Sequence, residues 1–156
     1  MKKLLIVAHT PSKNTKDLAN AVLAGAQHSD INNVETQLFS PFDCDADLVL
    51  KQDGIILFTT ENFGYMSGAL KDFFERIYYP CTEQAIRNNA KPFSLIIRAG
   101  IDGTGTDLAV HKITSGLKWR EVQPILLCKG DYTANFLQQC HDHGTIMAAG
   151  LDNEIF

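Results

Sequence analysis

Residues 1–17 read M-K-K-L-L-I-V-A-H-T-P-S-K-N-T-K-D and predict a buried strand, a polar loop and the start of a helix. Residues 4–8 form the short apolar run expected of a central strand. Thr10, Ser12 and Thr15 then bring three hydroxyls, and Asn14 an amide, to a helix start. Because the first N–H groups of a helix are unpaired and its dipole favours negative charge, this pattern favours phosphate binding. The alternative is an ordinary turn in which Ser12 or Asn14 only caps the helix.

Length and composition indicate one globular domain over residues 1–156, with 45% hydrophobic and 21% charged residues. The net charge is −4, and the 14 Lys and Arg residues form no basic stripe, which argues against nucleic-acid binding. No run approaches the roughly 18 apolar residues of a membrane span. The four cysteines lack C-x-x-C spacing and are interpreted as reduced thiols, so we expect a cytoplasmic protein without a signal peptide.

Strand-like and helical patterns alternate along the whole chain. Strands are predicted at residues 4–8, 35–39, 54–58, 93–97 and 124–127, and most are continuously apolar, as in strands buried on both faces. The clearest helical pattern includes Leu70, Phe73 and Ile77. A last helix is predicted over residues 133–149, with Gly150 as its cap. The alternation predicts an α/β fold, in which a parallel sheet has helices on both faces.

Ligands of such sheets bind beyond the carboxyl ends of the strands, where the strand order reverses. This rule directs attention to the loops after the first, third and fourth strands. The loop at residues 60–68 holds Phe63 and Tyr65, which could line a flat ligand, and Gly64, which permits close backbone approach. The alternative is that both aromatic rings fold back onto the domain.

The loop at residues 99–106 contains Gly100, Gly103 and Gly105. These glycines would leave backbone N–H and C=O groups open to the edge of a ligand, although a plain flexible turn is the alternative. Thr104 with Asp107 three residues later predicts a helix cap here. Together the three loops offer phosphate donors, aromatic walls and open backbone, a combination that suits FMN.

Other phosphate-binding patterns are missing from the sequence. The P-loop spacing is absent, and no dinucleotide fingerprint follows the first strand. Gly103-x-Gly105 is a partial match, but Leu108 stands at the third glycine position.

Cys140 and His143 could share a metal on one helical face, but two ligands are too few for structural zinc, so no metal site is predicted. His9 is interpreted as a strand-end residue rather than a catalytic base.

Three segments resemble the flavodoxin-like superfamily, most closely its NAD(P)H-dependent FMN reductase and quinone reductase branch. They are T-P-S-K-N-T at residues 10–15, D-G-I-I-L-F-T-T-E-N-F-G-Y-M-S-G-A-L-K-D-F-F-E-R at 53–76, and A-G-I-D-G-T-G at 99–105. The resemblance covers essentially the whole chain. It implies a three-layer, doubly wound fold whose five parallel strands lie in the order 2-1-3-4-5.

The resemblance also implies where FMN would bind. The predicted contacts are Thr10, Ser12, Lys13, Asn14 and Thr15 at the phosphate, and, around the ring, Thr60, Glu61, Asn62, Phe63, Gly64, Tyr65, Ala99, Gly100, Asp102, Gly103 and Thr104. Two positions depart from the family pattern. Lys13 stands where glycine is usual, and Thr60-Glu61 stands where the reductases commonly have proline.

The implied function is electron transfer from NAD(P)H through FMN to a quinone, a flavin or another small acceptor. No catalytic side chain is predicted, because the flavin carries the chemistry. The alternatives are a flavodoxin-type carrier that docks with redox partner proteins, and a flavin-binding module without turnover. Enzymes of this family are often dimers or tetramers, so the resemblance also implies a homo-oligomer.

Overall fold

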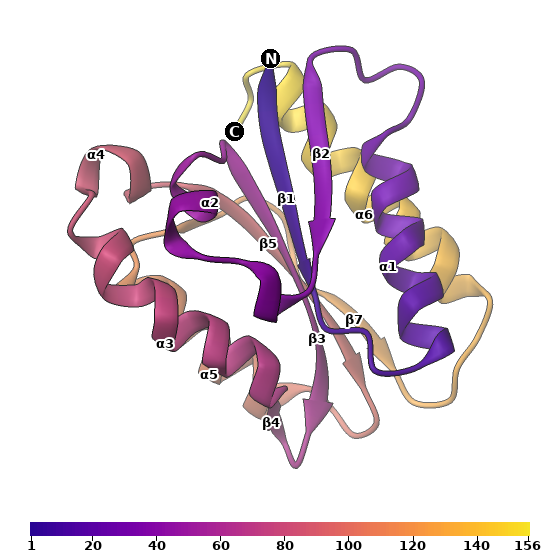
Figure 1. Cartoon of the computed structure of the whole chain (residues 1–156). Helices are drawn as coiled ribbons and strands as arrows, with labels where there is room; N and C mark the ends of the chain where they lie inside the picture. Colours follow the sequence, from indigo (N-terminus) through magenta and orange to yellow (C-terminus); the bar gives the residue numbers. More distant parts are fainter.

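One twisted parallel sheet forms the centre of the computed structural model, which describes residues 1–156 (Figure 1). Its long strands are β1 (Lys2–Ala8), β2 (Val34–Phe39), β3 (Gly54–Asn62) and β5 (Pro92–Ala99). They lie in the order β2-β1-β3-β5, and the short strands β6 (Arg120–Glu121) and β7 (Leu126–Lys129) both pair with β5. The five predicted strands therefore lie in the predicted order, and the predicted α/β fold with a parallel sheet is confirmed.

The central strands are buried on both faces, as their continuous apolar runs predict. In β1, residues 4–8 are all buried, and in β3 burial extends from residue 54 to residue 60. The parallel register places Ile6 of β1 beside Ile56 of β3, and Leu57 of β3 beside Leu95 of β5. Since parallel strands end at one edge of the sheet, the loops after β1, β3 and β5 become neighbours.

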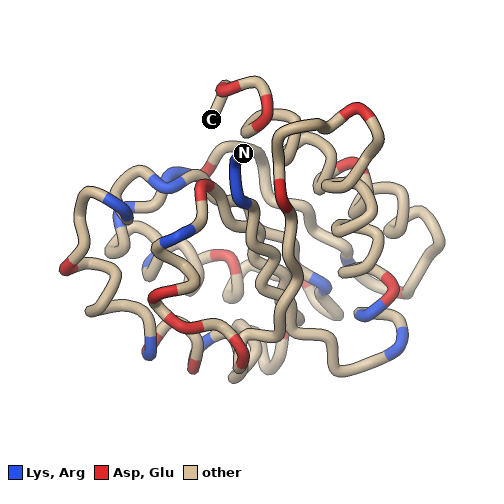
Figure 2. Tube along the Cα trace, turned by 45° about the horizontal axis from the view of Figure 1, so that its top comes forward, with Lys and Arg blue, Asp and Glu red and all other residues tan.

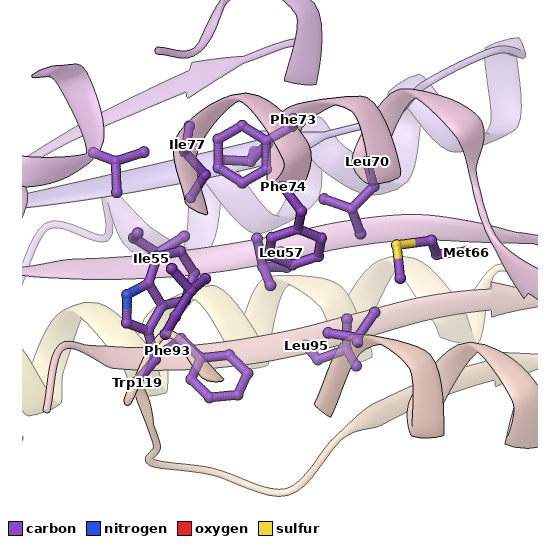
Figure 3. Close-up of a cluster of buried hydrophobic side chains, with 14 of the residues drawn as sticks. Ile55, Leu57, Met66, Leu70, Phe73, Phe74, Ile77, Phe93, Leu95 and Trp119 are labelled. Carbon is purple, nitrogen blue, oxygen red and sulfur yellow. The ribbon is translucent and has the colours of Figure 1, made fainter. Parts of the chain in front are cut away.

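Helices cover both faces of the sheet (Figure 1). One face carries α1 (Lys13–Ala26) and α6 (Asn135–Asp152), and the other carries α3 (Gly68–Thr82) and α5 (Thr104–Gly116). Shorter elements complete the chain: the 3₁₀ helix η1 (Pro41–Asp43), α2 (Ala46–Leu50) and α4 (Ala85–Asn88). Each face has its own hydrophobic core, and Figure 3 shows the core between the sheet and α3.

Several predicted element boundaries are wrong. Helix α6 does not end at Gly150 but continues to Asp152, with Asn153 as its cap. Gly150 is needed for a different purpose, because the ring of Phe156 packs where a Cβ would stand, 2.0 Å from its nearest ring atom. The last strand begins at Leu126, two residues later than predicted.

Helices α1 and α6 pack with their backbones in close contact. A Cβ on Gly144 of α6 would lie 2.1 Å from the carbonyl oxygen of Val22, and a Cβ on Gly25 of α1 would lie 1.9 Å from that of His141. Neither distance leaves room for a side chain. Gly144, which weakens the helical pattern in the sequence, is therefore explained by helix packing.

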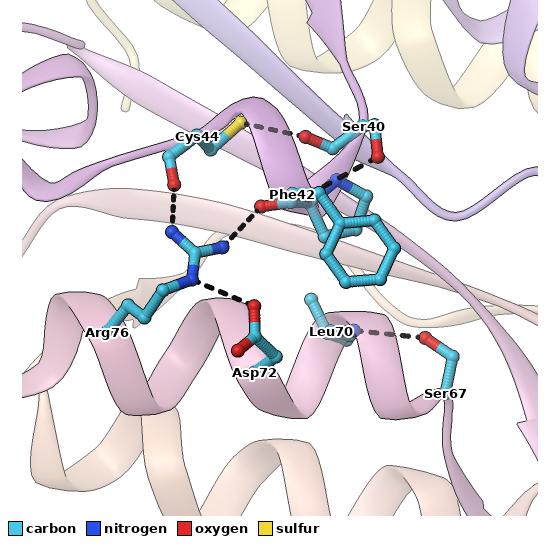
Figure 4. Close-up of polar contacts among 8 residues, drawn as sticks. Ser40, Phe42, Cys44, Ser67, Leu70, Asp72 and Arg76 are labelled. Atoms are coloured by element: carbon cyan, nitrogen blue, oxygen red, sulfur yellow. Dashed lines mark hydrogen bonds and ion pairs between the residues drawn. The ribbon is translucent and has the colours of Figure 1, made fainter.

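Arg76 of α3 fixes the segment that follows β2 (Figure 4). Its guanidinium donates to the carbonyl oxygens of Pro41 and Cys44, both at 2.7 Å, and to the carboxylate of Asp72 at 2.8 Å. A planar guanidinium suits three acceptors at once. All four cysteines are free and buried. The structure contains no helix of the length and apolarity that a membrane crossing requires.

Candidate functional site

Three loops meet at the carboxyl edge of the sheet and form the candidate site. We call residues 10–15 the first loop, residues 60–68 the second loop and residues 99–106 the third loop. They follow β1, β3 and β5, which are adjacent strands, and the N–H of His9 continues the pairing of β1 by donating to Phe58 at 3.0 Å. The chain turns to opposite sides of β1 for β2 and β3, so this edge is where the strand order reverses.

The first loop ends in a capping box. The N–H of Thr15 donates to the hydroxyl of Ser12 at 3.2 Å, and the N–H of Ser12 donates to the hydroxyl of Thr15 at 3.0 Å. The Thr15 hydroxyl also donates to the carbonyl oxygen of Ser12. Capping and phosphate binding are compatible here, because the N–H groups of Lys13 and Asn14 in the first turn have no partner within the protein.

Lys13 is the first residue of α1, and its backbone φ is not positive. The lysine therefore carries none of the strain that a glycine-requiring conformation would impose. Its ammonium group is exposed and forms an ion pair with Asp17 at 2.6 Å, one helical turn later. The pairing to Asp17 raises the pKa of Lys13 above its ordinary value. The side chains of Thr10 and Asn14 take no part in the capping network.

The second loop is a hairpin, which the sequence did not predict. Strand β3 runs on to Asn62 and pairs antiparallel with β4 (Tyr65–Met66) through a two-residue turn. Both turn residues, Phe63 and Gly64, have positive φ, as a type I′ hairpin turn requires. A positive φ is uncommon for phenylalanine, and this ring is fully exposed at the tip, while Tyr65 is partly exposed. Both rings therefore lie at the sheet edge rather than in the core.

Buried hydroxyls hold the base of the hairpin. The Thr59 hydroxyl accepts from the N–H of Ser67 at 3.1 Å, and the Ser67 hydroxyl caps α3 by accepting from the N–H of Leu70 at 3.1 Å (Figure 4 shows this cap). The two hydroxyls are also 3.1 Å apart. A serine directly before a helical pattern was the sequence signal for this cap.

Glu61 joins the second loop to the third. Its carboxylate accepts from the N–H of Ile101 at 2.8 Å and from the N–H of Gly103 at 2.6 Å. Gly103 has φ +71° and is the N-cap of α5, so the N-cap position itself has no side chain that could accept a hydrogen bond. The Glu61 carboxylate supplies negative charge at this helix start, where the dipole favours it.

The predicted cap by Thr104 and Asp107 is wrong. Thr104 is the first residue of α5, and its N–H donates to the carboxylate of Asp102 at 3.1 Å. This short-range bond holds the pKa of Asp102 below its ordinary value. Gly105 is needed for close packing, because a Cβ there would lie 1.9 Å from the carbonyl oxygen of Gly64. The tip of the second loop thus rests on the first turn of α5.

Arg98 holds the end of β5, where the third loop begins, and the sequence did not predict this role. Its guanidinium donates to the carbonyl oxygens of Ala99 at 2.9 Å and Cys128 at 3.1 Å, and it lies 5.3 Å from the centre of the Phe136 ring. These contacts join the ends of β5 and β7 to α6. An arginine directly after the strand-like run at residues 93–97 gave the only sequence signal for this role.

This edge of the sheet has mixed charges and one small adjoining cavity. Figure 2 shows Lys and Arg interspersed with Asp and Glu along the chain. Partial burial lowers the pKa of His9 at the end of β1, which favours its neutral form near this edge. A cavity of about 130 Å³ adjoins the third loop and is lined by Ile97, Asp102, Gly103, Thr104, Asp107, Ile125 and Leu127. None of the cavities is lined by the first or second loop.

Comparisons with known proteins find similarity in structure alone. No family model matches the sequence, and no curated protein matches it. Among solved structures, an archaeal flavodoxin superposes with a TM-score of 0.79 at 19% identity, covering 96% of this chain and 98% of its own.

Two further structures have comparable similarity. A WrbA-like flavodoxin from Agrobacterium tumefaciens gives a TM-score of 0.74 at 16% identity, covering 99% of each chain. The apo form of an NADH:FMN oxidoreductase gives 0.72 at 14% identity, covering 96% of this chain and 90% of its own. With the strand order and the layers, these matches establish that the chain has the flavodoxin-like fold.

Proposed function

We propose that this protein binds FMN at the three loops and passes electrons from NAD(P)H through the flavin to a quinone, a flavin or another small acceptor. One observation carries the proposal: three loops lie together at the point where the strand order reverses. The first has a helix start suited to a phosphate, the second has exposed aromatic rings, and the third has backbone N–H groups. The fold shared with flavodoxins and with an NADH:FMN oxidoreductase supports it.

The donors of the first loop fit a terminal phosphate. In this proposal, the free N–H groups of Lys13 and Asn14 donate to the phosphate oxygens, and the Ser12 hydroxyl turns its proton toward them. Lys13 adds a cation within reach of the helix start. No side chain beyond these is needed to hold a phosphomonoester.

The second and third loops would hold the flavin ring. Phe63 and Tyr65 offer exposed aromatic faces, and the backbone of residues 99–104 offers donors to the polar edge of the ring. Bound FMN supplies the chemistry of hydride acceptance and electron transfer, while the protein positions it and limits water access. The buried Thr59–Ser67 pair and Arg98 keep the two loops in place.

A flavodoxin-type carrier is the second candidate. The fully exposed ring of Phe63 projects from the edge at which a flavin ring would lie, where a redox partner protein could contact it. A carrier would hold FMN but would oxidise neither NADH nor NADPH.

The direct test is FMN titration of the purified full-length protein, followed by absorbance and flavin fluorescence. We expect a yellow protein with a dissociation constant in the micromolar range or below. A colourless protein that takes up no FMN at micromolar concentration would overturn the proposal. Oxidation of NADH and NADPH with a quinone acceptor then separates the two candidates, since turnover with either supports the enzyme and none supports the carrier.

The phosphate assignment has its own test. The double variant Ser12→Ala, Thr15→Ala removes the hydroxyls and the capping box together. Both the hydroxyls and the helix-start N–H groups would contact the phosphate, which riboflavin lacks, so either loss acts on FMN alone. We therefore expect FMN affinity to fall more than riboflavin affinity, and an equal loss for both ligands would refute the assignment.

A further inference from the structure

We propose that Glu61 is an internal competitor of the flavin: its carboxylate occupies the third-loop N–H groups to which the polar edge of the ring would bind, and the ring must displace it. This inference rests on the proposed function. It concerns two hydrogen bonds of this chain, from the N–H of Ile101 at 2.8 Å and from the N–H of Gly103 at 2.6 Å to separate oxygens of one carboxylate.

The backbone around these bonds is fixed on both sides. Glu61 pairs with Met66 in the β3–β4 hairpin, and Gly103 has the left-handed conformation that begins α5. The hairpin tip contacts α5 so closely that Gly105 has no space for a Cβ beside Gly64. The side chain of Glu61 can therefore leave these N–H groups by rotating, while the two loops remain in contact.

Carboxylates of the chain occupy three N–H groups of the third loop. The N–H of Thr104 donates to Asp102, so with Glu61 in place the N–H groups of Ile101, Gly103 and Thr104 are all bound to carboxylates of the chain. The carbonyl groups of a planar heterocycle accept hydrogen bonds as a carboxylate does, but they carry no full charge. A neutral acceptor thus competes with a charged one at the positive end of a helix.

Such competition raises the apparent dissociation constant, which equals the intrinsic one divided by the fraction of molecules in which the donors are free. If Glu61 leaves them free in a tenth of molecules, the apparent dissociation constant is about tenfold higher than the intrinsic one. Replacement of Glu61 should therefore tighten flavin binding. If the carboxylate instead only held the loops in order, replacement would weaken it.

The test compares Glu61→Gln and Glu61→Ala with wild type and with the charge control Asp107→Asn. Asp107 lies in the first turn of α5 and bonds His111, not the third-loop N–H groups. We expect both Glu61 variants to bind FMN about tenfold or more tightly than wild type, and riboflavin by the same factor, since the effect is at the ring. Asp107→Asn should change neither affinity more than twofold.

Two results would overturn the inference. One is that both Glu61 variants bind FMN as wild type does or more weakly. The other is that Asp107→Asn gains as much FMN affinity as the Glu61 variants but gains no riboflavin affinity. The second would mean that only the phosphate charge is sensed. Glu61→Gln keeps the side-chain size and so remains informative if Glu61→Ala does not fold.

Amide hydrogen exchange of the flavin-free protein provides a readout independent of binding. The N–H groups of Ile101 and Gly103 should exchange slowly in wild type and at least tenfold faster in Glu61→Ala, with the remaining amides of α5 protected in both. Equal exchange of these two amides would refute the contact even if FMN binds. If wild type and all variants bind no FMN, the proposed function fails, and the competition fails with it, whatever the exchange shows.

Discussion

The contact between α1 and α6 predicts a large loss of stability from one added methyl group. In Gly144→Ala the new Cβ would stand 2.1 Å from the carbonyl oxygen of Val22, 2.9 Å from its carbon and 3.1 Å from the nitrogen of Ala26. All three are backbone atoms and cannot rotate aside. The two helices would have to separate by about 1 Å, which would open the packing between them.

The expected magnitude follows from two opposing terms. Alanine is favoured over glycine inside a helix by about 1 kcal/mol, whereas overpacking against backbone costs about 3 kcal/mol, the upper part of its usual range. The net loss in the free energy of unfolding is therefore about 2 kcal/mol. For a chain of this size that corresponds to a fall in Tm of roughly 4–8 °C.

Urea unfolding followed by far-UV circular dichroism measures this change, and Gly68→Ala is the matched control. Gly68 is exposed at the start of α3, and a Cβ there would meet nothing within 4 Å. The control should be unchanged or more stable by up to about 1 kcal/mol. A Gly144→Ala variant as stable as wild type, with an unchanged m-value, would show that the helices do not approach as described.

Three further predictions concern buried or bridging polar groups. Burial lowers the pKa of His143 to about 4, so stability should fall as the pH drops from about 6.5 toward 4, and His143→Leu should reduce that slope in acid urea titrations. Arg76→Ala removes the hydrogen bonds to Pro41, Cys44 and Asp72 and should lower the free energy of unfolding by about 1–2 kcal/mol in urea titrations. Unchanged stability would mean that Arg76 does not hold the segment after β2 in place. The indole N–H of buried Trp119 donates to the side-chain oxygen of Asn88 at 2.8 Å. Asn88→Ala removes this acceptor and should lower the free energy of unfolding by about 2–3 kcal/mol. Unchanged stability together with unchanged indole fluorescence would refute this prediction.

The fold could be predicted because its determinants are local and periodic. The apolar run at residues 4–8 is buried on both faces, and the spacing of Leu70, Phe73 and Ile77 places these residues in one core. Strand order came from the resemblance to a known superfamily, since nothing in a run of apolar residues says which strand is its neighbour.

The missed features depend on contacts between distant segments. The role of Glu61 requires the second and third loops to be placed side by side, and the need for glycine at residue 144 requires α1 beside α6. The hairpin turn uses Phe63, not the glycine, asparagine or aspartate typical of its first position, so the usual signal was absent. Wrong helix ends, as at Gly150, arose where a glycine served packing rather than capping.

Equilibrium titration of the purified protein with FMN is the decisive experiment on whether the three loops form one FMN site. We expect one FMN bound per chain, with quenched flavin fluorescence and chemical-shift changes in amides of all three loops. Failure to bind FMN at micromolar concentration, or binding that leaves the amides of residues 10–15, 60–68 and 99–106 unchanged, would contradict it.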